Sequence, residues 1–131
     1  MTVLLTGGAG YIGSHVAVEL LQSGYDVIIA DNFYNSSQEV PERIREITEK
    51  SVRTYNVDIQ NSAALEQIFK QHEINAVMHF AGYKAVGEAV QQPLKYYRGN
   101  LDSTLTLLET MGKYPVSYTH LRAHETAANL V

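Results

Sequence analysis

Four glycines near the start of the chain have a spacing that suits the binding of a phosphate-containing ligand. Gly7, Gly10 and Gly13 form a G-x-x-G-x-x-G pattern that includes Gly8, and the apolar run of residues 3–5 leads directly into it. We expect Gly7 to allow a tight turn out of a strand, Gly10 to let the backbone approach a pyrophosphate, and Gly13 to let the following helix pack close to the strand. The N–H groups and dipole at the start of that helix would favour the anion.

Asp31 completes a dinucleotide-binding pattern. It closes the next apolar run, YDVIIAD, at about the 20-residue distance where the dinucleotide fingerprint places an acidic residue. A carboxylate at this point can accept hydrogen bonds from both adenosine ribose hydroxyls and repels a 2′-phosphate, which favours NAD over NADP. The alternative is a glycine-rich turn that binds nothing, followed by an ordinary strand-end aspartate. A P-loop is excluded because no Gly-Lys-Ser/Thr follows the glycines.

Strand and helix patterns alternate along the chain. The expected strands are residues 2–6, 26–30, 52–56 and 75–80, and the expected helices are residues 11–23, 41–50, about 61–71 and 93–112. We place the third strand near a sheet edge because it is the least apolar. Strand–helix alternation with short links predicts an α/β fold: a partial, truncated, doubly wound parallel sheet, Rossmann-like, with strand order 3-2-1-4.

Two helices show apolar stripes that predict their contacts. The stripe of the first consists of Ile12, Val16 and Leu20. The stripe of the last consists of Leu94, Tyr97, Leu101, Leu105 and Leu108. We expect the second stripe to serve both the sheet and a partner.

Composition sets limits on the class of protein. The 131 residues suffice for one domain at most, and 45% hydrophobic residues suffice for a core. The net charge of −4 argues against a nucleic-acid surface. The absence of cysteine excludes disulfides and thiol catalysis and is compatible with a reducing compartment. With no signal-peptide or membrane-span pattern, we expect a soluble cytoplasmic protein.

The end of the chain has a different character. From Val116 it reads VSYTHLRAHETAANLV, and no strand pattern is visible where a fifth strand should follow the last helix. The segment YTHLRAHET resembles translated sequencing-adapter sequence. We therefore expect residues 1–115 to form a partial NAD-binding domain and residues 116–131 to be a non-native tail. His120 and His124 in this tail have a metal-compatible spacing without a third ligand, so no metal site is expected.

Three segments together resemble the UDP-glucose 4-epimerase family, an extended branch of the short-chain dehydrogenases/reductases. They are GGAGYIGSH, DNFYNSS and HFAGYKAVGEAVQQPLKYY, and the resemblance covers residues 1 to about 114. It implies the N-terminal, NAD-binding part of an isomerase of galactose metabolism that interconverts UDP-glucose and UDP-galactose through a 4-keto intermediate. It also implies a nucleotide-sugar substrate and, at full length, a homodimer paired through helices that include the one starting at Pro93.

The resemblance also implies a set of cofactor-binding residues. They are Gly7, Gly10, Tyr11, Ile12, Gly13, Asp31, Asn32, Asn35, Ser36, Asp58, Ile59, Phe80, Ala81, Gly82, Lys84 and Asn100. In the family, the pair at Asp58 and Ile59 contacts adenine; the alternative is a helix-entry aspartate beside a core isoleucine. The loop with Asn32, Asn35 and Ser36 lies on the ribose side, and its alternative is ordinary turn chemistry.

The residues after the fourth strand lie where an open α/β sheet binds its ligand. Small Ala81 and Gly82 would let the backbone pass close to a cofactor, and Lys84 could supply positive charge or be a solvated surface lysine. Asn100, a poor helix former inside a helix, would lie near the cofactor. His79 is expected to be a packed, hydrogen-bonded histidine.

No catalytic residue is expected in this chain. The family's base is a tyrosine four residues before a lysine that lowers its pKa, and none of the nine tyrosines here has a lysine at that distance. The expectation is therefore a truncated, inactive piece of an epimerase. The alternatives are a non-catalytic NAD-binding module and a fragment of another nucleotide-sugar enzyme, a dehydratase or decarboxylase.

Overall fold

The structure, a computed structural model, describes residues 1–33, 38–81, 90–114, 116 and 118–121, without the side chains of 96, 97 and 118–121. Its sheet is parallel and has the order β3-β2-β1-β4-β5 within the described residues. The strands are β1 (Thr2–Thr6), β2 (Asp26–Asp31), β3 (Arg53–Asn56), β4 (Ala76–His79) and β5 (Tyr118–Leu121). The helices are α1 (Tyr11–Gln22), α2 (Val40–Thr48), α3 (Ser62–Gln71) and α5 (Pro93–Lys113). The predicted α/β class and the order 3-2-1-4 are confirmed, with one further strand.

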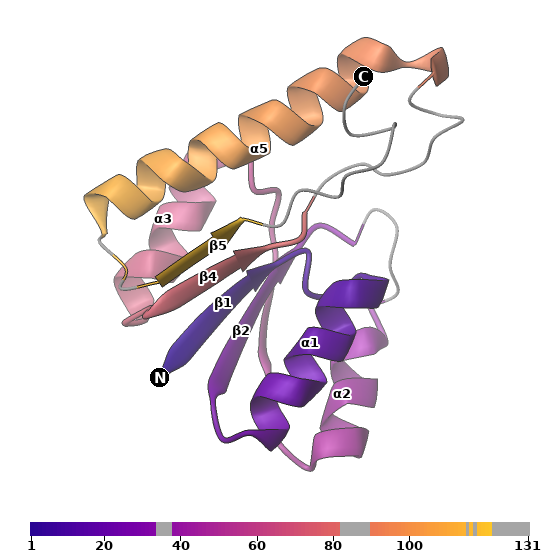
Figure 1. The fold of residues 1–131 in the computed structure, drawn as a ribbon, viewed down its shortest axis with the longest axis vertical. Coiled ribbons are helices and arrows are strands. Elements are labelled where there is room, and N and C mark those ends of the chain that lie inside the picture. Colours follow the sequence, from indigo (N-terminus) through magenta and orange to yellow (C-terminus); the bar gives the residue numbers. More distant parts are fainter. Residues whose placement is uncertain (34–37, 82–89, 115, 117, 122–131) are drawn as a thin grey trace.

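Helices cover both faces of the sheet, as Figure 1 shows. Because side chains alternate along a strand, Leu4 of β1 faces α3 and α5, whereas Val3 and Leu5 face α1 and α2. The α3 side of the core receives Leu65, Ile68 and Phe69. The central strands are therefore apolar on both faces, which explains their continuous apolar runs.

Helix α1 approaches the sheet through a different face from the predicted one. Its buried residues are Gly13, Ala17 and Leu21. The predicted stripe of Ile12, Val16 and Leu20 lies one position earlier along the helix and is only partly buried. Small side chains at the centre of the contact let the helix axis come close to the strands.

The predicted apolar stripe of α5 is wrong as a core contact. Its described leucines are exposed: Leu94 by 71%, Leu101 by 52%, Leu105 by 47% and Leu108 by 41%. The side chain of Tyr97 lies outside the description. The buried face is instead formed by Gly99, Ser103, Leu107, Thr110 and Met111. Because that face contains small and polar residues, the apolar periodicity of the sequence did not indicate it.

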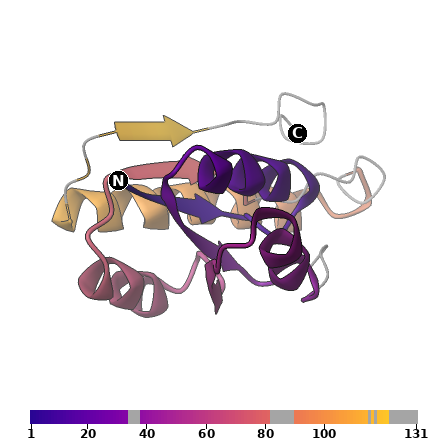
Figure 2. The ribbon, with the colours of Figure 1, turned by 90° about the horizontal axis from the view of Figure 1, so that it is seen from below.

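A fifth strand exists where no strand pattern was visible. β5 pairs in parallel with β4, in a register that runs from Ala76–Tyr118 to His79–Leu121, and Figure 2 shows it at one margin of the sheet. The expectation that no fifth strand follows the last helix is therefore wrong, and β5 covers the edge of β4. That residues 116–131 are non-native stays a prediction, although Val116 packs against the core.

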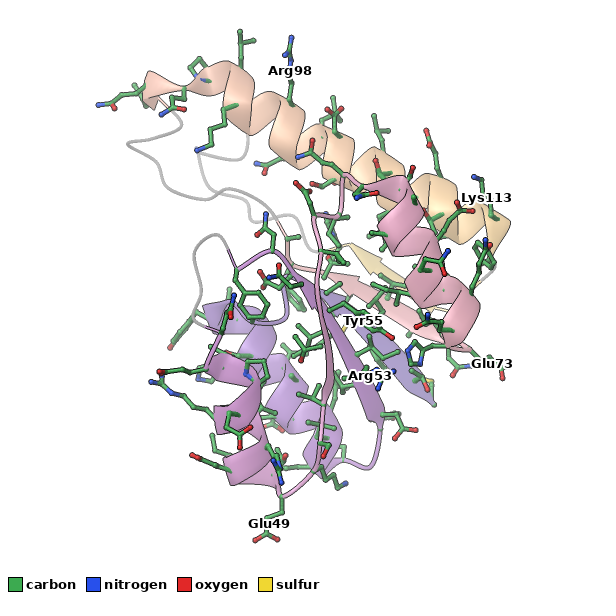
Figure 3. The ribbon with its side chains drawn as sticks, turned by 180° about the vertical axis from the view of Figure 1, so that it is seen from behind. Glu49, Arg53, Tyr55, Glu73, Arg98 and Lys113 are labelled. Atoms are coloured by element: carbon green, nitrogen blue, oxygen red, sulfur yellow. The ribbon has the colours of Figure 1, made fainter. Side chains whose placement is uncertain are left out.

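β3 forms the opposite margin of the described sheet, as predicted. Its Tyr55 hydroxyl lies 2.7 Å from Nε2 of His72 and donates to Oε1 of Gln71 at 3.1 Å, tying the strand to the end of α3. Arg53 lies beside Tyr55, as Figure 3 shows, and its hydrogen bond to that hydroxyl raises the pKa of the guanidinium. At the other end of α3, Oδ1 of Asn61 accepts the N–H of Ala64, which makes Asn61 the N-cap of this helix.

Candidate functional site

The glycine turn begins with Gly7 in a left-handed conformation. Its φ is +71°, its N–H donates to the carbonyl of Ala30 at 2.7 Å, and its carbonyl accepts the N–H of Gly10 at 3.1 Å. A Cβ at Gly7 would lie 2.6 Å from the backbone nitrogen of Ala81, the segment that follows β4. Any side chain here would collide with that segment, so the predicted tight turn is confirmed.

Each of the remaining glycines of the motif lies at a position where a side chain would meet a different neighbour or the same neighbour at a different distance. A Cβ at Gly13 would lie 2.5 Å from the carbonyl oxygen of Gly7, so this glycine lets α1 pack on the turn itself rather than on the strand. A Cβ at Gly10 would meet the same oxygen at 3.3 Å. Gly8, to which the sequence assigned no role, lies against the side chain of Ile29, which a Cβ would approach to 2.8 Å.

The N-terminus of α1 offers backbone donors to a ligand. Gly10 is the N-cap, no side chain caps it, and the first turn holds no acidic residue. The N–H groups of residues 11–13 precede the first turn-closing bond, from the N–H of Ser14 to the carbonyl of Gly10 at 2.9 Å. Together with the helix dipole, this arrangement suits an anion. Tyr11 is 82% exposed, and Ile12 is partly buried.

Asp31 lies beside this turn with both carboxylate oxygens engaged. Oδ2 accepts the N–H of Ala9 at 3.0 Å, and Oδ1 accepts the N–H of Phe33 at 2.7 Å. Phe33 reaches that position with a φ of +57°. The carboxylate is only 8% exposed and is fixed at the carboxyl end of β2. Each oxygen retains a second lone pair that can accept a hydroxyl. Asn32, the next residue, is exposed.

Asp58 and Ile59 follow β3 close to Asp31. The N–H of Val57 donates to the carbonyl of Asp31 at 3.1 Å, which brings the ends of β2 and β3 together. Asp58 is exposed, and its Oδ1 accepts the N–H of Gln60 at 2.9 Å, whereas Ile59 is buried in the core. This geometry fits a helix-entry aspartate and a core isoleucine, and adenine contact by this pair stays a prediction.

The end of β4 reaches the same edge of the sheet. Phe80 is buried, and its N–H donates to the carbonyl of Thr6 at 2.8 Å, which holds Phe80 and Ala81 against the glycine turn. Asn100 is partly buried in α5. The predicted site residues Asn35, Ser36, Gly82 and Lys84 lie outside the described residues.

His79 is a packed, hydrogen-bonded histidine, as predicted. It is 6% exposed, and its two ring nitrogens lie within hydrogen-bond distance of the hydroxyls of Thr6 and Thr104. In the described part of the chain, no three His, Cys, Asp or Glu side chains gather as a metal site would need. Nor does any described helix have the length and apolarity needed to cross a membrane.

Comparison with known proteins agrees with this arrangement. A family model described as "NAD dependent epimerase/dehydratase family" matches residues 3–130. The UDP-glucose 4-epimerase of Bacillus subtilis is 53% identical over 116 residues, which cover 88% of this chain and 34% of that protein. The chain thus spans about a third of the length of the curated relatives it matches.

Two solved structures have a closely similar fold. A Bifidobacterium longum UDP-glucose 4-epimerase in complex with NAD+ and UDP matches with a TM-score of 0.93 and 47% identity, over 95% of this chain and 37% of that one. A UDP-glucose 4-epimerase from Stenotrophomonas maltophila with bound NAD matches with a TM-score of 0.89 and 41% identity, over 92% of this chain and 36% of that one.

Proposed function

Because this chain belongs to the NAD dependent epimerase/dehydratase family, we propose that it is the N-terminal, NAD-binding part of a UDP-glucose 4-epimerase. Its relatives of that name and its structural neighbours with bound NAD support the proposal. The isomerase activity, the interconversion of UDP-glucose and UDP-galactose, belongs to the whole protein.

The described residues fit a dinucleotide. Because Gly7 and Gly13 carry no side chain, the glycine turn packs directly on the backbone at Ala81 and on α1, and this packing fixes the start of α1 where a ligand would bind. The N-terminus of α1 at Gly10 is open to an anion, which is the place for the pyrophosphate. Asp31 lies on the same edge with two oriented acceptor oxygens, the place for the adenosine ribose.

The fixed carboxylate of Asp31 is the observation that carries the preference for NAD. Its two backbone hydrogen bonds orient it, and its low exposure removes water that would otherwise screen its charge. A 2′-phosphate placed there would meet like charge, whereas ribose hydroxyls would donate to it. The proposal also includes the other described members of the predicted site, which are Tyr11, Ile12, Asn32, Asp58, Ile59, Phe80, Ala81 and Asn100.

When bound, NAD supplies reversible oxidation at the sugar 4-position. The described residues bind and orient it. The glycine turn places the start of α1, the backbone N–H groups of α1 donate to the pyrophosphate, and the carboxylate of Asp31 accepts hydrogen bonds from the ribose. The 131-residue sequence contains no Tyr-x-x-x-Lys pair, so we propose that the polypeptide alone is a non-catalytic NAD-binding module.

We also propose that α5 pairs with a second copy of the chain. Its exposed leucines at positions 94, 101, 105 and 108 lie on one helical face, with spacings of 7, 4 and 3 that suit helix–helix packing. Apolar side chains grouped in this way favour association. A cytoplasmic location is included in the proposal, supported by the lack of cysteine.

Isothermal titration calorimetry of the purified chain with NAD and with NADP tests the central proposal. We expect binding of NAD with at least tenfold weaker binding of NADP. Equal or tighter binding of NADP would contradict the role given to Asp31, and the absence of binding to either dinucleotide would contradict the proposed function.

A further inference from the structure

His79 forms hydrogen bonds to two different elements next to the glycine turn. Its Nδ1 lies 2.5 Å from Oγ1 of Thr6, the last residue of β1 and the neighbour of Gly7. On the other side of the ring, Nε2 lies 3.3 Å from Oγ1 of Thr104 in α5. The buried imidazole therefore links the strand that leads into the glycine turn with the helix that carries Asn100.

The hydrogen-bond donors along this path can be assigned. Oγ1 of Thr104 donates its single proton to the backbone carbonyl of Asn100 at 3.0 Å, so it accepts from Nε2–H of His79. A neutral imidazole protonated at Nε2 leaves Nδ1 as the acceptor for the hydroxyl proton of Thr6. The path runs in one direction, from Thr6 through His79 and Thr104 to the carbonyl of Asn100.

This path reaches a part of α5 whose described side chains have little apolar packing. Leu107 and Met111, toward the C-terminal end of the helix, are buried in the core. Nearer its N-terminal end, the buried positions among the described side chains are Gly99 and Ser103, which contribute little apolar area. Among the described side chains in this part of α5, Thr104 therefore makes a directional contact. Its hydrogen bonds to His79 and to the carbonyl of Asn100 fix this turn of the helix.

We propose that His79 is a positioning residue of the dinucleotide site, which fixes the turn of α5 carrying Asn100 relative to the glycine turn. The inference rests on the proposed function, in which both segments contact NAD. Without this link, the position of α5 relative to the glycine turn would have to be fixed when the ligand binds. That ordering lowers affinity even though His79 itself does not touch the ligand.

Substitutions at Thr104 test the link without altering the histidine. Thr104→Val keeps the shape but removes the hydroxyl, and it should weaken NAD binding about fivefold, the effect of one net hydrogen bond. Thr104→Ser keeps the hydroxyl and should restore affinity to within about twofold. Thr110→Val is the matched control, because Oγ1 of Thr110 donates to the carbonyl of Thr106 at 2.9 Å in the same helix, away from His79. An equal loss of affinity in the Thr110 variant would overturn the proposal, as would full affinity in Thr104→Val.

Two substitutions of His79 separate its hydrogen bond to Thr104 from its hydrogen bond to Thr6. His79→Gln can place a donor near the position of Nε2 and keep the bond to Thr104, whereas His79→Asn can place an acceptor near Nδ1 and keep the bond to Thr6. We expect the glutamine variant to bind NAD more tightly than the asparagine variant. Equal NAD affinities of the two variants, at equal melting temperatures, would show that the contact of His79 with α5 does not affect NAD binding.

Nitrogen-15 NMR of the histidine rings in the full 131-residue chain tests the link without NAD. The signals that disappear in His79→Gln belong to His79, and we expect a proton on Nε2 and none on Nδ1. Thr104→Val should shift the Nε2 signal and the backbone amide signals near Asn100, whereas Thr110→Val should leave both in place. A proton on Nδ1 would overturn the assigned path. If the unaltered chain shows the expected NMR signals but does not bind NAD, the proposed function fails, and the link between His79 and α5 remains as structure alone.

Discussion

The carboxylate of Asp31 accepts the backbone N–H of Ala9, across 22 residues of sequence and at 3.0 Å. The bond joins the acidic end of β2 to the middle of the glycine turn, so the two halves of the dinucleotide pattern form one unit. Each orients the other before any ligand arrives. Because the donor is a backbone N–H, only a change of Asp31 removes this bond. Such a change should affect both folding and binding, and the two effects have to be measured separately.

Asp31→Asn tests the electrostatic half of this relationship. The amide can still accept one backbone N–H but has lost the negative charge that attracts ribose hydroxyls and repels a 2′-phosphate. We expect NAD affinity to fall about tenfold to a hundredfold, since hydrogen bonds to charged groups contribute about 1.5–3 kcal/mol, and NADP affinity to fall less. Calorimetry with both dinucleotides measures the ratio.

Asp26→Asn is the matched control for that experiment. Asp26 is on the same strand but is exposed, at the end away from the glycine turn. It should leave the NAD to NADP ratio unchanged within experimental error. If both aspartate variants shift the ratio equally, the preference reflects the net charge of the protein and not the position of Asp31.

The same substitution should have opposite effects on stability at two helical glycines. In Gly13→Ala the new Cβ would lie 2.5 Å from the carbonyl oxygen of Gly7, so the helix or the turn must move, at a cost of about 1–3 kcal/mol in unfolding free energy. In Gly112→Ala the Cβ meets nothing within 4 Å, and better helix propensity should add about 0.5 kcal/mol. Urea denaturation measures both. A Gly13 variant as stable as the original would show that the turn adapts freely.

Much of the fold could be predicted from local patterns, because those patterns reflect local physical requirements. Gly7 has the positive φ that its position in the motif demands, and Asn61 caps α3 as its side chain allows. The contact between Ala9 and Asp31 could not be derived in this way, since it depends on how two strands lie side by side.

The errors also have physical causes. Periodicity in α5 identified a real apolar face at Leu101 and Leu105, but it cannot say whether such a face packs on the sheet or points outward. β5 was missed because Tyr118–Leu121, with two polar residues side by side in its middle, shows neither an apolar run nor a strand-like alternation, and pairing with β4 provides its backbone hydrogen bonds. The role of Gly8 depends on Ile29, a distant residue, so no local signal could have revealed it.

The isolated chain should have no epimerase activity. A sugar 4-hydroxyl needs a base to take its proton, and the sequence offers no tyrosine with a lysine four residues later to lower its pKa. A coupled assay for the conversion of UDP-galactose to UDP-glucose should give the rate of the buffer blank. Turnover that follows the protein through purification would mean that another group in these 131 residues serves as the base.

Association through α5 gives the last prediction. We expect the chain to form dimers or larger species at micromolar concentration, because its leucine face exposes apolar side chains over four turns of one helix, from Leu94 to Leu108. Leu101→Glu should shift light scattering toward the monomer, because a charge in that face would be desolvated on pairing. Ile47→Glu on α2, where the isoleucine is 61% exposed, is the matched control and should leave the scattering unchanged. Since β5 covers the edge of β4, this association should depend on α5 and not on that edge. A cooperative, monomeric melt of the unaltered chain would contradict pairing through the leucine face.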